Sequence, residues 1–176
     1  MKQYILSILV LSVCMVACEN KDNKDTKTTA SSTSSVALPY QATYGTEFTN
    51  DVSDADLLTV LNSYKYWETG DLKAMRSILA DSVELLLSSG WKFNGTADSL
   101  MKVTAPFRDS LSSASIQMIT WLKNHSVKDS SDWVNVWYKE IDTYKTGKVD
   151  SAEYEDDNML KNGKIVYTSS HRMVLK

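Results

Sequence analysis

The sequence predicts one α+β domain in which three helices come first and a curved, mostly antiparallel sheet follows. Between residues 53 and 111, apolar residues recur three times at the three- and four-residue spacing of amphipathic helices. Between residues 116 and 175, segments rich in β-branched and aromatic residues are separated by short turn signals. Because strands joined by short turns are usually neighbours in space, we expect the helices to pack together on one face of the sheet.

The first two helices have clear start and stop signals. Ser53 is followed three residues later by an acid and is expected to cap the first helix, which Gly70 ends. Asp71 is expected to cap a second, shorter helix that reaches residue 81. The first helix should bury an apolar stripe made of Leu57, Val60, Leu61, Tyr64 and Trp67.

A third helix is expected to begin at Thr96 or Asp98, after a first strand at residues 83–87 and a loop or short hairpin. This helix contains Pro106. Proline removes a helical hydrogen-bond donor and clashes with the preceding turn. We therefore expect the helix to be kinked or divided near Ala105.

Four later segments are predicted to form the body of the sheet. Residues 116–122 alternate between two faces with the period of a strand. Residues 133–144 carry apolar side chains on both faces, which is typical of a central strand that is covered on both sides. Two further strands, at residues 149–160 and 164–175, follow short turn signals.

The N-terminal segment has the pattern of an export signal. Lys2 is followed by an apolar run at residues 4–13, which is too short to span a bilayer as a mature helix. Residues 15–18, Met-Val-Ala-Cys, resemble a bacterial lipobox. This resemblance implies that Cys18 becomes the first mature residue and carries a lipid that holds the protein on a membrane. The alternative is a plain secretory signal with a chance cysteine.

The chain is expected to contain four parts. A lipoprotein signal peptide at residues 1–17 precedes a polar tether at 18–37, whose composition predicts disorder. Aromatic residues return in a lead segment at 38–52, which we expect to lie against the domain formed by residues 53–176. Within the tether, the sequence Glu-Asn-Lys-Asp that follows Cys18 resembles the acidic signals of surface-exposed lipoproteins of the Bacteroidetes type.

Composition argues against several classes of function. The 176 residues carry a formal net charge of -3 without a basic patch, so nucleic acid is not an expected partner. Both cysteines lie in or beside the signal, so the mature domain is expected to have no disulfide and no thiolate metal site. Neither histidine belongs to a pattern with metal-ligand spacing, and no Gly-rich phosphate loop is present, so we expect no metal and no cofactor.

Four short motifs occur in order along residues 53–176. They are Gly70-Asp71-Leu72 after the first helix, Ala80-Asp81-Ser82-Val83 at the first strand, the helix start from Gly95 to Leu100, and Asn162-Gly163-Lys164-Ile165 before the last strand. In this order they resemble the NTF2-like superfamily, and in particular its SnoaL-like branch. The resemblance implies a cone in which a curved sheet wraps around the three helices. It also implies that the cone often encloses an apolar pocket and often forms a dimer.

The superfamily includes enzymes of the ketosteroid isomerase type, which use a carboxylate base and an oxyanion pair made of a Tyr and a protonated Asp. In this sequence, the position that resembles the general base is Leu87, and the position that resembles the oxyanion tyrosine is Ser63. The acidic run at residues 153–157 falls near the second carboxylate of that family. Isomerase chemistry in the manner of the family is therefore not expected.

Aromatic side chains are the main candidates for a binding site. They suit a flat or sugar-like ligand when a few polar groups accompany them, although they are more often part of the core. As alternatives, His171 could act as a base if Glu140 or an acid of the 153–157 run orients it, and that run could be a solvated or edge-strand face. The residues that we expect to line a pocket are Trp91, Trp137, Tyr138, Glu140 and Tyr154.

The leading hypothesis is a membrane-anchored, non-catalytic NTF2-like lipoprotein that binds a small apolar or aromatic ligand, or a partner protein, in the cell envelope. The lipid would hold it on the outer membrane, on the periplasmic or the surface side. The alternative is a divergent SnoaL-like enzyme, a cyclase, dehydratase or isomerase, that uses His171 or an acid of the 153–157 run. A third hypothesis is a structural homodimer formed through the second apolar face of residues 133–144.

Overall fold

The computed structural model describes residues 39–173. The predicted signal peptide, Cys18 and the predicted tether lie outside the described residues. The chain divides into a unit at residues 1–40 and a unit at residues 41–176, and the second unit contains all the helices and strands described below. Within the described part, no helix is long and apolar enough to cross a membrane.

Side-chain caps define where each helix begins. The hydroxyl of Ser53 accepts a hydrogen bond from the backbone N–H of Asp56 at the start of α1 (Asp54–Thr69), which ends at the left-handed Gly70. Asp71 accepts from the N–H of Ala74 and caps α2 (Leu72–Ile78). Thr96 caps α3 (Ala97–Ser110) in the same way. The three predicted helices and their caps are therefore confirmed.

The predictions of a divided third helix and of a second helix that reaches residue 81 are both wrong. Pro106 lies inside α3 but does not divide it, because the helix continues to Ser110. The ring removes one backbone donor, and the loss of one hydrogen bond near the C-terminus does not end a packed helix. The second helix stops at Ile78 rather than at residue 81, because Leu79 already begins a strand.

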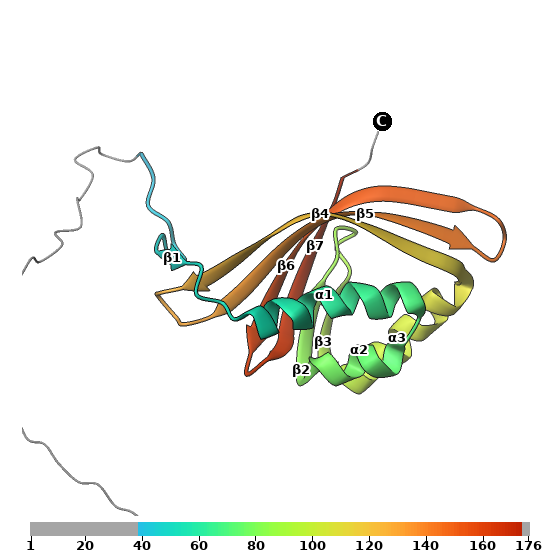
Figure 1. The fold of residues 1–176 in the computed structure, drawn as a ribbon, viewed down its shortest axis with the longest axis horizontal. Coiled ribbons are helices and arrows are strands. Elements are labelled where there is room, and N and C mark those ends of the chain that lie inside the picture. Colours follow the sequence, from blue (N-terminus) through green and yellow to red (C-terminus); the bar gives the residue numbers. More distant parts are fainter. Residues whose placement is uncertain (1–38, 174–176) are drawn as a thin grey trace, which may run out of the picture. The chain divides into compact units, whose positions relative to one another are not determined.

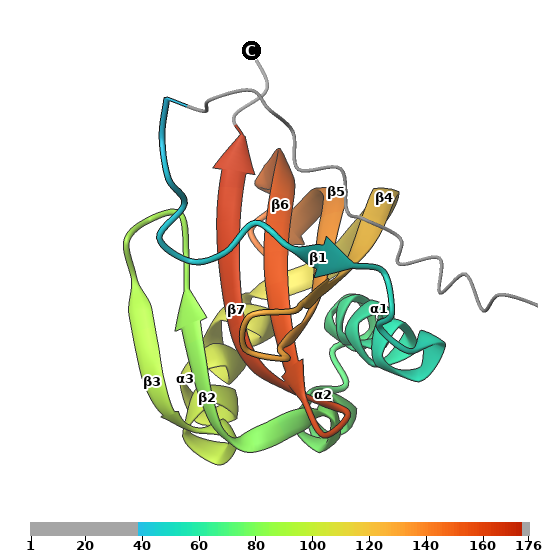
Figure 2. The same cartoon turned by 90° about the vertical axis from the view of Figure 1, so that its left-hand side faces the viewer.

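Seven strands form one curved sheet that arches over the helices (Figure 1). The strand order is β1-β4-β5-β6-β7-β2-β3, and Figure 2 shows β3 and β4 toward opposite sides of this array. Every neighbouring pair is antiparallel except β2 with β7, so the predicted mostly antiparallel sheet is confirmed. The strands are β1 (Phe48–Thr49), β2 (Leu79–Leu86), β3 (Lys92–Thr96), β4 (Leu111–Ser126), β5 (Asp132–Tyr144), β6 (Val149–Lys161) and β7 (Lys164–Met173).

A bulge in β4 changes which side chains face the helices. Met118 pairs with Tyr138 and Thr120 pairs with Trp137, so Ile119 is an extra residue between them. Beyond the bulge, Lys123 faces the helices, and its ammonium group lies 2.9 Å from Asp54 at the start of α1. The prediction of one unbroken alternation along residues 116–122 is therefore wrong.

The strand predicted to be central, β5, lies between β4 and β6. Val134, Val136 and Tyr138 on its inner face are buried in the core with residues of the helices. β6 is also an interior strand, so the edge-strand interpretation of residues 153–157 is wrong. Strand alternation instead sends the side chains of this run to opposite faces of the sheet.

Residues 41–52 contact the end of β4 at several points. β1 pairs with β4 through Phe48 and Ser126, and the backbone N–H of Val127 donates to Glu47. Val52 has only 2% of its surface exposed and belongs to the core cluster. These contacts bring the chain from the sheet edge to the start of α1.

Gly70 provides a test of how the end of α1 is built. Its φ of 73° is left-handed, and a Cβ there would lie 3.3 Å from the guanidinium of Arg108. That guanidinium donates to the carbonyl oxygens of Trp67 and Glu68 at 2.8 Å each. Gly147 has a φ of 86° and no atom within 4 Å of such a Cβ, so it is the matched control.

We expect Gly147→Ala to lower the free energy of unfolding by about 1 kcal/mol, the cost of a left-handed alanine. Gly70→Ala should cost about 2 kcal/mol, because it also displaces Arg108 from the end of α1. Urea denaturation of both variants measures the difference. Equal losses would show that Arg108 does not hold this helix end.

Candidate functional site

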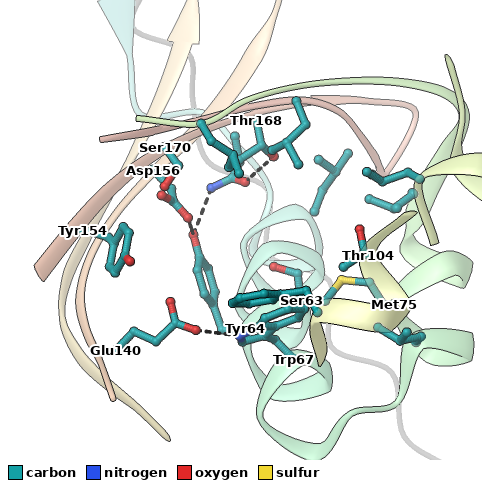
Figure 3. A pocket seen from close by; sticks show the side chains of 18 of the residues that line it. Ser63, Tyr64, Trp67, Met75, Thr104, Glu140, Tyr154, Asp156, Thr168 and Ser170 are labelled. Carbon is teal, nitrogen blue, oxygen red and sulfur yellow. Dashed lines mark hydrogen bonds between the residues drawn. The ribbon is translucent and has the colours of Figure 1, made fainter. Parts of the chain in front are cut away.

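A cavity of about 470 Å³ lies between the helices and the inner face of the sheet. All three helices and the strands β2 and β4 to β7 contribute side chains to it, and most of these side chains are apolar (Figure 3). Pockets that bind small molecules usually have volumes of about 300–1,000 Å³. The cavity is therefore large enough for one small organic molecule.

Strand alternation places the polar groups of the cavity. Tyr138 and Tyr154 are opposite each other in the β5–β6 register, and their rings stack with centroids 5.4 Å apart. Every second residue along the two strands then points in the same direction. The inward-facing residues of β5 and β6 that line the cavity are Tyr138, Glu140, Asp142, Tyr154, Asp156 and Asn158.

Asp156 is the most buried acid of the cavity, with 6% of its surface exposed. Its Oδ2 accepts a hydrogen bond from the hydroxyl of Tyr64 at 3.0 Å (Figure 3). It also accepts from the hydroxyl of Tyr138 at 3.0 Å. The Tyr64 hydroxyl also accepts from the side-chain amide of Asn158 at 3.2 Å. Within residues 39–173, Asp156 Oδ1 is buried and has no hydrogen-bond partner of good geometry. A free acceptor oxygen therefore lies in the wall of the cavity.

Burial raises the pKa of Asp156 to about 6, although the nearby Ser170 hydroxyl and the hydrogen bonds from Tyr138 and Tyr64 act in the opposite direction. Burial also raises the pKa values of Tyr64 and Tyr138 well above 10, so both phenols remain donors. A carboxyl group with a pKa near 6 can accept or release a proton close to neutral pH. Asp156 thus has the environment of an acid–base group.

A second acidic group lies on β5. The indole Nε1 of Trp67 donates to Glu140 Oε1 at 2.5 Å (Figure 3). Burial, followed by repulsion from Asp142, raises the pKa of Glu140 to about 8. Burial raises the pKa of Asp142 as well, and its Oδ1 lacks a hydrogen-bond partner in the described part of the chain. At neutral pH, Glu140 therefore keeps its proton in most molecules.

The cavity does not have the ligands of a metal or phosphate site. Among residues 39–173, no group of three or more His, Cys, Asp or Glu side chains is arranged to hold a metal ion. The described lining residues also include no Lys, Arg or His that could bind a phosphate-bearing cofactor.

Four of the five residues expected to line a pocket do line this cavity, and they are Trp91, Tyr138, Glu140 and Tyr154. The fifth, Trp137, lies on the other face of the sheet, because it is between the inward-facing Val136 and Tyr138. There it borders a shallow hollow with Ile119, Leu122 and Met173. The prediction that Trp137 lines the same site is therefore wrong. A homodimer formed through this outer face stays a prediction.

His171 also lies away from the cavity. It is opposite Glu155 in the β6–β7 register, and this position belongs to the outer face of the sheet. Its Nε2 is 3.2 Å from the Ser169 hydroxyl and 3.8 Å from Asp157 Oδ2. Glu140 points to the opposite face and cannot orient His171 as a base.

Leu87 and Ser63, which resemble the catalytic positions of the isomerases, both line the cavity. However, the tyrosine of α1 that donates to the buried carboxyl group is Tyr64, one residue after Ser63. No sequence pattern assigned a site role to Tyr64, Asp142 or Asn158, and none singled out Asp156 within its acidic run. One sequence signal for Asp156 was available. Residues two apart on a strand point to the same face, and Asp156 is two residues from the predicted pocket residue Tyr154.

Comparison with known proteins relates the fold to solved structures. No protein-family model matches the sequence, and no curated protein matches it. An NTF2-like protein of unknown function from Exiguobacterium sp. 255-15 aligns with a TM-score of 0.54 and 17% identity, over 66% of this chain and 99% of that one. The fold is NTF2-like. The predicted cone is therefore confirmed.

Two other solved structures carry more specific descriptions. A candidate dehydratase of the NTF2-like family from Streptomyces avermitilis aligns with a TM-score of 0.59 and 12% identity, over 69% of this chain and 96% of that one. A protein with a ketosteroid isomerase-like fold from Catenulispora acidiphila, solved in complex with trimethylamine, aligns with a TM-score of 0.53 and 10% identity, over 64% of this chain and 83% of that one. Identities this low establish the shared NTF2-like fold alone.

The raised pKa of Glu140 predicts how stability depends on pH. The unfolded chain loses this proton near pH 4.5, whereas the folded NTF2-like domain holds it until about pH 8. The folded state therefore binds more protons between these values, and the free energy of unfolding should fall as the pH rises through this window. Glu140→Gln should remove about 1–3 kcal/mol of this fall.

Urea denaturation between about pH 5 and pH 9 measures this effect. Glu84→Gln, at an exposed position on β2, is the control and should leave the pH profile unchanged. The same slope in Glu140→Gln as in the wild type would contradict the assignment.

Proposed function

We propose that this protein is a membrane-anchored lipoprotein whose NTF2-like domain binds a small, largely apolar ligand in the cavity of the cone. The observation that carries the proposal is the cavity of about 470 Å³, with apolar walls and a buried carboxyl oxygen of Asp156 that has no partner of good geometry among the described residues. Apolar walls provide binding energy by burying ligand surface, and a few polar groups fix the orientation of the ligand.

The two buried acids, Asp156 and Glu140, have different roles in ligand binding. Asp156, held by Tyr64 and Tyr138, offers an acceptor oxygen at one position. Glu140, held by Trp67, offers a protonated carboxyl group at neutral pH at another. The C. acidiphila neighbour was solved with a small organic molecule, which agrees with ligand binding by this fold.

A cavity-filling variant tests ligand binding. Leu87 lines the cavity, whereas its neighbour Leu86 does not, so tryptophan at each position gives a matched pair. The neutral fluorescent compound 1-N-phenylnaphthylamine should bind the wild-type domain and Leu86→Trp with similar affinity. Leu87→Trp should bind at least about tenfold more weakly, because the indole occupies ligand space. Equal binding by both variants would place the dye elsewhere and contradict the proposal.

The membrane anchor rests on the lipobox-like residues 15–18. A lipid on Cys18 would place the domain in the cell envelope, with the polar residues that follow as a tether. Cys18→Ala should leave the protein in the soluble fraction of cells that carry out lipoprotein processing, whereas the wild type should sediment with membranes. Continued membrane retention of Cys18→Ala would contradict lipidation at this residue.

A second candidate function is acid–base catalysis, in the manner of a divergent SnoaL-like cyclase, dehydratase or isomerase. It is favoured by the pKa of about 6 at Asp156, an acid of the 153–157 run with 6% of its surface exposed. The candidate dehydratase from S. avermitilis shares the fold. Since His171 lies on the outer face, Asp156 is the residue to test as the base.

Deprotonation of 5-nitrobenzisoxazole is a suitable test reaction, because a buried carboxylate base accelerates its elimination. Activity should rise with pH through about 6 and fall by at least about tenfold in Asp156→Asn. Asp157→Asn, which changes the neighbouring outward-facing acid, should retain the rate. An unchanged rate in Asp156→Asn would remove this second function.

A further inference from the structure

The charged groups of the cavity are all acidic. Glu140, Asp142 and Asp156 line it, and the described lining residues include no basic side chain. Two of the three acids, Asp142 and Asp156, each have a buried oxygen without a hydrogen-bond partner of good geometry in residues 39–173. Asp156 is 6% exposed, so water does not surround its carboxyl group. The cavity therefore has acceptor capacity that the described protein groups leave unused.

The nearest arginines are engaged elsewhere. Arg108 donates to the backbone carbonyls of Trp67 and Glu68, and Arg172 donates to both oxygens of Asp150 at 2.8 and 3.0 Å. Arg108 lowers the pKa of Asp142 through space, but burial outweighs it and that pKa stays raised. The titratable and charged groups around the cavity are Tyr64 on α1, Arg108 on α3, Tyr138, Glu140 and Asp142 on β5, Asp150, Tyr154, Asp156 and Asp157 on β6, and Arg172 on β7.

Aromatic rings form much of the remaining wall. Trp67 and Phe107 stack with centroids 5.9 Å apart, and Tyr138 stacks on Tyr154. The faces of aromatic rings attract organic cations, more strongly when water is excluded. The same rings bury the apolar substituents that such a cation carries. The carboxyl groups and the aromatic faces therefore both favour a positively charged ligand.

We propose that the cavity selects an organic cation, an amine or quaternary ammonium group that bears apolar substituents. The ammonium centre would lie by the free Oδ1 of Asp156, and the substituents would lie among the rings and aliphatic side chains. An anionic ligand would meet three acids and no described basic group in the wall. This inference rests on the proposed ligand-binding function and adds the charge of the ligand.

Binding of a cation should be coupled to the release of protons from the buried carboxyl groups. A cation stabilises the charged form of the carboxyl groups and therefore releases the protons that burial keeps on Glu140 and Asp156. Affinity should then rise as the pH increases from about 5.5 to about 8.5. A ligand that accepts a hydrogen bond from protonated Glu140 shows the opposite dependence. The sign of the pH effect therefore separates the two ligand classes.

The test compares benzyltrimethylammonium with neopentylbenzene, its uncharged carbon isostere, by displacement of 1-N-phenylnaphthylamine from the wild-type domain. The quaternary ammonium does not titrate, so any pH dependence comes from the protein. We expect the cation to bind at least about tenfold more tightly than the isostere at about pH 8.5, and to lose about tenfold in affinity at about pH 5.5. Calorimetry in buffers with different ionisation enthalpies should show proton release.

Three variants support the assignment of the acids. Glu140→Gln and Asp156→Asn should each weaken the cation about tenfold while leaving the isostere within about twofold. Glu155→Gln on the outer face is the control and should change neither ligand. Circular dichroism establishes that each variant is folded.

Two outcomes would overturn the inference. One is tighter or equal binding of the isostere at about pH 8.5, and the other is cation binding that weakens as the pH rises. In either case, dye binding that is still lost in Leu87→Trp would leave the proposed function intact. If neither compound nor the dye binds, both the ligand charge and the proposed function are wrong.

Discussion

The inner faces of β5 and β6 carry Glu140, Asp142 and Asp156 into a space that the helices cover, and much of the structure follows from this placement. An ionised carboxyl group loses several kcal/mol of hydration when it is buried without a countercharge. The described lining contains no countercharge. The acids are stabilised instead by donors from Tyr64, Tyr138 and Trp67, and by retained protons.

Helix α1 supplies two of those donors. Tyr64 and Trp67 are three residues apart on α1, so one helical face provides both the phenol for Asp156 and the indole for Glu140. Arg108 of α3 bonds the carbonyls at the end of α1 and lies 5.9 Å from the centroid of the Trp67 ring. Arg108, the C-terminal end of α1 and the two acids are therefore connected through Tyr64 and Trp67. Buried acids that reduce stability are more often retained at functional sites than elsewhere.

The helices could be predicted because their start and stop signals lie in the sequence next to the helix ends. The hydroxyl of Ser53, the carboxylate of Asp71 and the absence of a side chain at Gly70 act within a few residues of their own position. The turn at Asn162 and Gly163 is local in the same sense, since both residues adopt positive φ values. The order of elements and the fold class could be inferred from these signals together.

The site was less predictable because it depends on the pairing of distant strands. Side chains alternate along a strand, so Trp137 and Tyr138 must point to opposite faces of the sheet. Strand pairing and helix placement decide which of the two faces the helices. The bulge at Ile119 reverses the parity of β4 and has no signal in its own residues. Parity with Tyr154 separates Asp156 from its acidic neighbours, but only the β5–β6 register, which sets it opposite the core residue Val136, shows that it faces the helices.

Both the stability of the domain and the proposed ligand binding depend on the protonation of the buried acids. NMR spectroscopy of the carboxyl carbons of the domain, selectively labelled at Glu and Asp and assigned with Glu140→Gln and Asp156→Asn, measures these equilibria individually. We expect Glu140 to titrate at about 8 and Asp156 at about 6. Titration of both groups near the ordinary value of about 4 would contradict this expectation, because the carboxyl groups would then be in contact with water rather than buried in the cavity.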